Sequence, residues 1–187
     1  MEAATRLVDA NGAEAVTLRA VAREVGISAP SIYDHFDDRD QILNAVIQRC
    51  FAELTADITT ARDGVTDDPV DRLSAGCDAY LRFAERQPQR YALLFRRPNP
   101  RDEAAYGAQD DAGAVAFGTL VEGIADCAAA ERSTSAEPFN DATALWAALH
   151  GYASLRTAQT AFPWPDHQDT LTRIIYGLAH ITARRQG

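Results

Sequence analysis

The stretch TLRAVAREVGISAPSIYDHF, residues 17–36, decides the fold of this 187-residue chain. Thr17 stands before an apolar helical run, where threonine caps a helix, and Gly26 follows the run, where glycine ends one. Ser28 caps a second, very short helix that we expect to end near His35. Two such helices joined by a three-residue turn predict a helix-turn-helix, whose second helix enters the major groove of DNA.

Helical signals continue on both sides of this stretch, and the sequence has no strand alternation and no internal repeat. Residues 2–11 are expected to form a helix ahead of it. Asp38, followed three residues later by Gln41, has the spacing of a capping box that opens a long helix. Apolar periodicity predicts further helices at about residues 69–86, 88–95, 111–131, 139–161 and 166–185. Residues 96–110, which contain proline and glycine, are expected to form a surface loop.

The prediction is therefore an all-α protein of about nine helices in two parts, a three-helix domain at residues 1–45 and a helical bundle at residues 46–187. The apolar fraction of 47% and the charged fraction of 24% are those of an ordinary globular protein. No apolar run approaches the roughly 20 residues that span a bilayer, and the N-terminus does not resemble a signal peptide. We expect a soluble, cytoplasmic protein with no membrane part.

The overall charge argues against DNA binding. The chain has 18 basic and 27 acidic residues, for a net charge of −9, whereas nucleic-acid binders usually have a basic excess. All the basic residues are arginines, which bind phosphates and guanine edges in planar, bidentate geometry. Three expected helix N-termini, at Thr17, Ser28 and Arg39, offer backbone N–H groups to phosphates without any net positive charge. DNA binding must then rely on a few local contacts.

The run GISAPSIYDHFDDRDQIL, residues 26–43, resembles the signature of the tetracycline-repressor-like (TetR) family. TLRAVA at residues 17–22 and ANGAEA at residues 10–15 are also similar to that signature. The resemblance covers residues 2 to about 50. It implies a homodimeric transcription regulator that binds double-stranded, palindromic operator DNA and has a variable domain for ligand binding and dimerisation. Relatives often carry a few basic residues upstream of the first helix, so we expect an N-terminal arm ahead of Met1.

The short second helix is expected to present Ala29 and Pro30, whose small side chains let the backbone approach the base edges. Ser31 is suited to bond with either partner of a base pair, and Tyr33 to reach a phosphate or a thymine methyl group. Asp34 places a carboxylate beside the expected phosphate path, where it either points outward or lowers affinity. By the resemblance, the residues that fall where family members touch DNA are Thr17, Arg19, Ser28, Ser31, Tyr33, His35 and Arg39.

The second part carries a weaker resemblance. WAALHGYASL at residues 146–155 is similar to the Trp-His-Gly type of C-terminal domain found in some of these regulators, and PQRYALLF at residues 88–95 fits the same subgroup. Pockets between bundled helices are lined by apolar and aromatic side chains, which predicts a mostly hydrophobic effector. The candidate ligand-binding residues are Tyr80, Phe83, Tyr91, Phe95, Phe117, Trp146 and His150. Each of them is also explained as a core residue, and His150 as a hydrogen-bonded buried histidine.

The family resemblance also implies that the last two helices form a four-helix bundle across a two-fold axis. Four apolar residues of the last helix would form the dimer interface: Leu171, Ile174, Ile175 and Leu178. A second interpretation stays open, in which the same residues face the chain's own core.

Catalysis is the function that the sequence argues against. The four histidines, at positions 35, 150, 167 and 180, have no metal-binding spacing, and there is no glycine-rich phosphate loop or Gly-x-Ser-x-Gly elbow. We expect no enzyme activity, no metal and no cofactor. The alternative that remains is a helical ligand carrier or interaction module with a degenerate helix-turn-helix, which the acidic composition favours.

The three cysteines, Cys50, Cys77 and Cys127, are odd in number and far apart in sequence. They form no Cys-x-x-Cys pair, so neither a disulfide framework nor a zinc site is expected. Two interpretations stay open: buried thiols on helix faces, or a redox-sensing cysteine.

Overall fold

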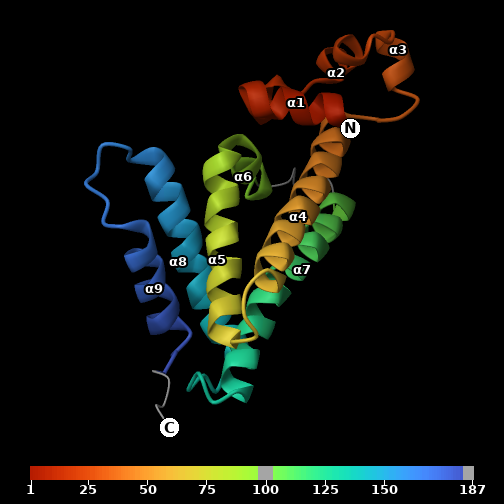
Figure 1. Cartoon of the computed structure of the whole chain (residues 1–187). Helices are drawn as coiled ribbons and strands as arrows, with labels where there is room; N and C mark the ends of the chain where they lie inside the picture. Colours follow the sequence, from red (N-terminus) through yellow and green to blue (C-terminus); the bar gives the residue numbers. More distant parts are fainter. Residues whose placement is uncertain (97–102, 183–187) are drawn as a thin grey trace. The chain divides into compact units, whose positions relative to one another are not determined.

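A computed structural model describes the backbone of residues 1–96 and 103–182, and the side chains of these residues except Ala29 and residues 103–111. Every regular element in this part is helical: nine α-helices and one short 3-10 helix, with a single isolated β-bridge. The all-α prediction is thus confirmed (Figure 1). The chain forms two compact units. Unit 1 consists of Met1–Glu53 and Gln87–Ala114, and unit 2 of Leu54–Arg86 and Val115–Gly187.

Unit 1 begins with the helix-turn-helix, whose boundaries follow from local hydrogen bonds. The Thr17 side chain accepts a hydrogen bond from the backbone N–H of Ala20 at 3.1 Å, and Ser28 does the same for Ser31 at 3.4 Å. Gly26 has φ 74° and ψ 27°, the left-handed conformation that ends a helix. The helices of this part are α1 (Glu2–Asn11), the 3-10 helix η1 (Ala13–Ala15), α2 (Leu18–Val25) and α3 (Ala29–Ile32).

One helix boundary and one capping hydrogen bond in this part differ from the sequence prediction. Helix α3 ends at Ile32 rather than near His35, and the following residues form a turn. Helix α4 (Arg39–Asp63) starts where predicted, and its Gln41 N–H donates to Asp38 Oδ1 at 2.9 Å. The Gln41 side chain, however, bonds to Asp37 rather than Asp38: its Oε1 accepts from the Asp37 N–H at 3.0 Å. One bond of the capping box thus forms at Asp38 as predicted, and the reciprocal bond forms with Asp37 instead.

The rest of unit 1 comprises α6 (Pro88–Leu94) and the first part of α7 (Glu103–Ala129). Its core is formed by fully buried side chains of α1, α4 and α6, among them Val8, Ile42 and Leu93. Helix α7 starts eight residues earlier than predicted, so residues 103–110 are helical and not a loop. The alanines in this segment are strong helix formers, which outweigh its one glycine. Residues 97–102 lie outside the described part.

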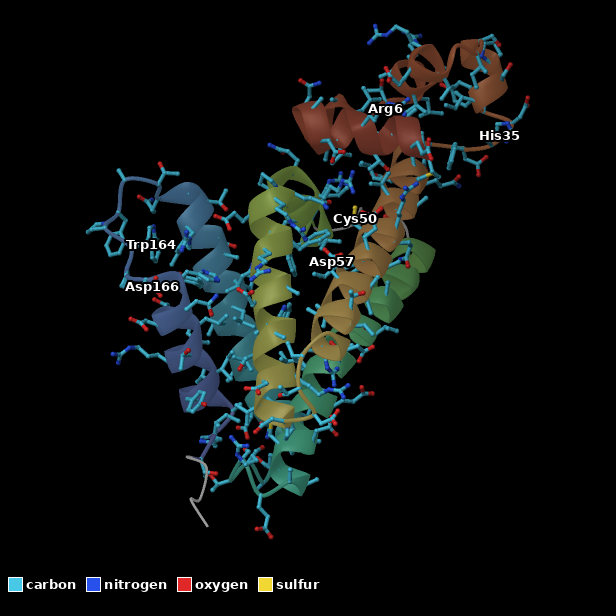
Figure 2. All side chains as sticks on the ribbon, in the orientation of Figure 1. Arg6, His35, Cys50, Asp57, Trp164 and Asp166 are labelled. Atoms are coloured by element: carbon cyan, nitrogen blue, oxygen red, sulfur yellow. The ribbon has the colours of Figure 1, made fainter. Side chains whose placement is uncertain are left out.

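In unit 2, helices α5 (Pro69–Arg86), α8 (Pro138–Ala158) and α9 (His167–Leu178) lie side by side (Figure 1). The buried side chains of Phe83, Ile124 and Leu145 belong to its core. The Asp166 carboxylate caps α9 by accepting from the Asp169 N–H at 3.0 Å, and this bond lowers the pKa of Asp166 (Figure 2). Helix α9 ends before the predicted residue 185, because His180 adopts a positive φ of 51° and the chain turns there.

Candidate nucleic-acid interface

The outer face of the helix-turn-helix carries most of the side chains predicted to touch DNA. Tyr33 is 57% exposed, and Ser28, Pro30 and His35 are also exposed. Ser31 is half-buried and shares a 2.7 Å hydrogen bond with the Ser28 hydroxyl. The side chain of Ala29 lies outside the described ones. Since Ile32 is buried beneath them, this short segment presents one polar face outward.

Helix α2 adds two arginines to this surface. Arg19, which the sequence predicts, and Arg23, which it does not, are both exposed and stand one turn apart. Neither forms a hydrogen bond or an ion pair with any described residue, so both guanidinium groups are available to an anion. The spacing of four residues on one predicted helix is the signal that could have identified Arg23.

Arg39 is held differently from the phosphate contact that the sequence predicts. Its Nε donates to the carbonyl oxygen of Val16 at 2.7 Å, and its Nη2 donates to that of Ala13 at 2.9 Å. The same Nη2 lies 3.1 Å from Glu14 Oε2. Two of the three guanidinium nitrogens thus tie the start of α4 to η1 and the residue after it. This geometry assigns Arg39 a structural role in unit 1.

Few arginines in residues 1–45 remain available to bind phosphates. Residues 1–45 contain four arginines and eight acidic residues. Arg6 of α1, which Figure 2 labels, pairs with Glu24 of α2 at 3.2 Å. Because Arg39 is also engaged, Arg19 and Arg23 are the arginines of this region that no described carboxylate neutralises.

Comparisons with known proteins agree with this geometry. Residues 1–46 match the family model described as bacterial regulatory proteins, tetR family. Residues 73–177, more than half of the chain, match the model described as tetracyclin repressor-like, C-terminal domain. The chain belongs to the TetR family of transcriptional regulators. This family is one of regulatory proteins and not of enzymes, and the second match does not specify the Trp-His-Gly type.

Individual relatives are more distant. The regulator is 26% identical over 155 residues to the uncharacterized HTH-type transcriptional regulator Rv0681 of Mycobacterium tuberculosis, covering 83% of this chain and 67% of that protein. It is 31% identical over 121 residues to the HTH-type transcriptional regulator Rv1816 of the same organism, covering 62% of this chain and 51% of that one. The regulator thus spans about half the length of the second relative.

A solved structure of a protein of unknown function from Rhodococcus sp. RHA1 has the same fold. Its TM-score is 0.79 at 23% identity, with 94% of this chain and 89% of that chain covered. This likeness supports the fold and gives no information about the ligand.

The candidate ligand-binding residues of the regulator fall into separate groups. Tyr80 and Phe83 are buried in α5 of unit 2. Tyr91 and Phe95 belong to unit 1, where their rings meet edge-to-face at 5.1 Å. Trp146, in contrast, is an exposed residue of α8.

Phe117, Trp146 and His150 form an aromatic cluster on α7 and α8, which also includes Phe139. The Phe117 ring lies 5.4 Å from Phe139 and 6.0 Å from Trp146, both edge-to-face, and Trp146 lies 6.4 Å from His150. Partial burial lowers the pKa of His150, which favours its neutral form. The sequence analysis missed Phe139, although its spacing of seven residues from Trp146 places both on one helix face.

The dimer interface predicted on α9 needs correction. Leu171 and Ile175 are only 2% and 1% exposed within a single chain, so they pack in its own core. Ile174 and Leu178 are half-buried and retain some surface. The four residues have the i, i+3, i+4 and i+7 spacing of a single helix face, and the burial of Leu171 and Ile175 shows that this face packs on the chain's own core.

The cysteines of the regulator are all buried. Burial raises the pKa of Cys50 and of Cys77 to about 12, and that of Cys127 to about 11. A redox sensor needs an accessible thiolate, which requires a lowered pKa. The two open interpretations are therefore separated in favour of structural thiols.

Two further features concern metals and membranes. Within residues 1–96 and 103–182, no group of three or more histidine, cysteine or acidic side chains is arranged to hold a metal ion. Residues Ala112–Ala129 of α7 are long and apolar enough to cross a membrane by length and composition, with a mean hydropathy of 1.3. Glu122 and Asp126 interrupt this stretch, and core helices of soluble proteins meet the same criteria of length and composition. Because the chain belongs to a family of DNA-binding regulators, we interpret Ala112–Ala129 as part of a helix of a soluble protein.

Proposed function

We propose that this regulator binds a two-fold symmetric operator as a cytoplasmic homodimer and represses transcription until a small, mostly hydrophobic effector releases it. The observation that carries the proposal is the exposed face of α2 and α3, where Tyr33, Arg19 and Arg23 are available to DNA. Within the proposal, residues 1–45 read the DNA and residues 46–187 bind the effector and the second copy. The exposed Ser28 and Pro30 at the start of α3 favour close approach to base edges, and Tyr33 and the arginines favour phosphate contacts.

The homodimer is supported by an unusual surface on α8. Its exposed residues are all uncharged, whereas those of α5 (Asp71, Arg82, Glu85 and Arg86) are all charged. A helix face without charges over five turns is typical of a surface that a partner covers. The exposed residues of α8 are Phe139, Asn140, Thr143, Ala144, Trp146, Ala147, Leu155, Thr157 and Ala158.

Sedimentation tests this part of the proposal. Ala147→Glu places a charge at the centre of the uncharged face and is expected to give a monomer at micromolar concentration. Arg82→Glu on the exposed face of α5 is the matched control and should stay dimeric. A wild-type protein that sediments as a monomer at this concentration would refute the homodimer.

Effector release is proposed to act through α4, which contributes residues to both units. An effector that tilts this helix changes the separation of the two recognition helices in the dimer. By linkage, operator DNA must then weaken effector binding by the same factor. The aromatic side chains of α5, α6, α7 and α8 support a hydrophobic effector, and the WAALHGYASL segment supports the Trp-His-Gly type of C-terminal domain.

Selection from a random library of double-stranded DNA tests the function. The wild type is expected to enrich a two-fold symmetric motif with half-sites about one helical turn apart. Tyr33→Ala, which removes an exposed side chain and leaves the core intact, should enrich none. If the wild type enriches nothing at low salt, the acidic composition favours a helical carrier with a degenerate helix-turn-helix.

A further inference from the structure

Arg90 of α6 holds carboxylates from two other helices of unit 1. Its Nε and Nη2 donate to Asp9 Oδ1 and Oδ2 of α1 at 2.6 and 2.7 Å. Its Nη1 donates to Glu53 Oε2 of α4 at 2.6 Å. Paired, bidentate bonds between charged groups are the strongest and most directional hydrogen bonds in proteins. One guanidinium therefore joins α1, α4 and α6, a set we call the Arg90 clamp (Asp9, Glu53 and Arg90).

The clamp is partly shielded from water. The Arg90 side chain is 18% exposed, and its hydrogen bonds with Asp9 raise the pKa of the guanidinium above its ordinary value. Helices α1 and α6 also touch directly beside it: a Cβ added at Gly12, which follows α1, would lie 2.9 Å from Gln89 Oε1. The contact between the two helices is thus both ionic and close.

Helix α1 passes this restraint on to the helix-turn-helix. Arg6 lies three residues before Asp9 and pairs with Glu24 of α2 at 3.2 Å. Residues three apart lie close on a helix surface, so α1 is bound to α6 at one position and to α2 at the next. These two ion pairs thus connect α2, and with it α3, to α6 by way of α1.

Arg90 also lies close in sequence to the point where the chain passes from unit 2 back into unit 1. Helix α5 ends at Arg86 in unit 2, and the second segment of unit 1 starts at Gln87. Arg90 is the third residue after Gln87. Arg90 is therefore joined to the last residue of α5 by a short covalent connection.

We propose that Arg90 is a positioning residue for operator recognition, which fixes α1 against α4 and α6 and so sets the orientation of α2 and α3. A shift of α6 relative to α1 breaks the Arg90 clamp and releases the helix-turn-helix. This inference rests on the proposed function, since it assigns the regulation of the same DNA-binding surface.

The test compares Arg90→Gln, Asp9→Asn and the double variant in full-length protein, with the selected operator and a scrambled duplex of equal length. Each single variant is expected to weaken operator binding about tenfold, and the double variant no further than Arg90→Gln, because Arg90→Gln already removes the interaction that Asp9→Asn removes. Binding to the scrambled duplex should stay within about twofold, since phosphate contacts do not depend on the register of the recognition helix. Arg90→Lys keeps the charge without the planar fork and should fall in between.

Arg86→Gln is the matched control, because Arg86 is an exposed arginine that forms one ion pair, with Asp57 at 2.8 Å. It should bind the operator like the wild type. Affinities are measured under conditions in which denaturant titration shows that each variant is folded. Operator affinity within twofold of the wild type for Arg90→Gln would overturn the proposal, as would an equal loss on both duplexes, which indicates a folding defect.

Hydrogen exchange separates this proposal from the proposed function. The amides of α1 should exchange about tenfold faster in Arg90→Gln than in Arg86→Gln, because α1 has lost its restraint. If the wild type selects no DNA motif, the proposed function fails, and the exchange of α1 still decides whether the clamp exists. Unchanged exchange in α1 would refute the clamp even in a protein that binds its operator.

Discussion

The helix-turn-helix and the α7–α8 surface, which carries the aromatic cluster of Phe117, Phe139, Trp146 and His150, are stabilised by different kinds of interaction. In the former, Thr17, Gly26 and Ser28 each set a helix boundary through one local hydrogen bond or one backbone conformation. Helix α8, in contrast, has no side-chain cap and is placed by buried residues such as Leu145. Substitutions of single surface residues should therefore change the function of the helix-turn-helix. Substitutions of core residues should instead lower the stability of the region around α8.

The largest expected effect is therefore on the stability of unit 2. Phe83→Ala removes a fully buried ring and should lower the free energy of unfolding by about 3–5 kcal/mol, because a cavity remains. Phe162→Ala in the exposed connection between α8 and α9 is the control, with an expected loss of about 1 kcal/mol or less from its contact with Trp164. Denaturant titration measures both. Equal losses would mean that Phe83 is not a core residue.

The same difference explains what the sequence could predict. Caps and the left-handed glycine act within four residues, so α1, α2 and the start of α4 were predicted with their boundaries. The hydrogen bonds of Arg39 were not predicted, because its partners at Ala13 and Val16 lie more than 20 residues away in sequence. Periodicity also identified α9 without showing that both Leu171 and Ile175 face the chain's own core.

The second expected effect tests whether two arginines carry the ionic part of DNA binding. The double variant Arg19→Gln/Arg23→Gln should weaken operator binding about 100-fold at low salt, because two charged hydrogen bonds to phosphate are lost. The slope of log affinity against log salt should decrease in magnitude by about 2. Titrations at several salt concentrations measure both quantities.

Arg86→Gln is the control for this variant, since Arg86 is an arginine of α5 that pairs with Asp57 at 2.8 Å. Its slope should equal that of the wild type. If the double variant keeps the wild-type slope, groups other than Arg19 and Arg23 neutralise the phosphates. The proposal that the unpaired arginines of α2 supply the ionic contacts would then be wrong.

A smaller effect sharpens the view that local conformation fixes the helix-turn-helix. Gly26→Ala introduces a Cβ at φ 74°, although no atom lies within 4 Å of it, so the change acts through the backbone alone. The free energy of unfolding should fall by about 1–2 kcal/mol. Gly118→Ala in α7 also meets no atom within 4 Å, but its helical backbone should make the variant more stable by about 0.5–1 kcal/mol. The same sign for both variants would contradict this account.

The smallest expected effect concerns the α7–α8 surface and pH. Because partial burial lowers the pKa of His150, the unfolded chain takes up a proton at this residue before the folded chain does. Stability should thus fall as the pH drops below the ordinary histidine pKa of 6.5, and this part of the loss ends below the folded pKa. His150→Gln should reduce the loss between pH 7 and pH 5 in denaturant titrations. His35→Gln, at an exposed position outside unit 2, should leave it unchanged, and an equal reduction in both variants would show that His150 is not the group responsible.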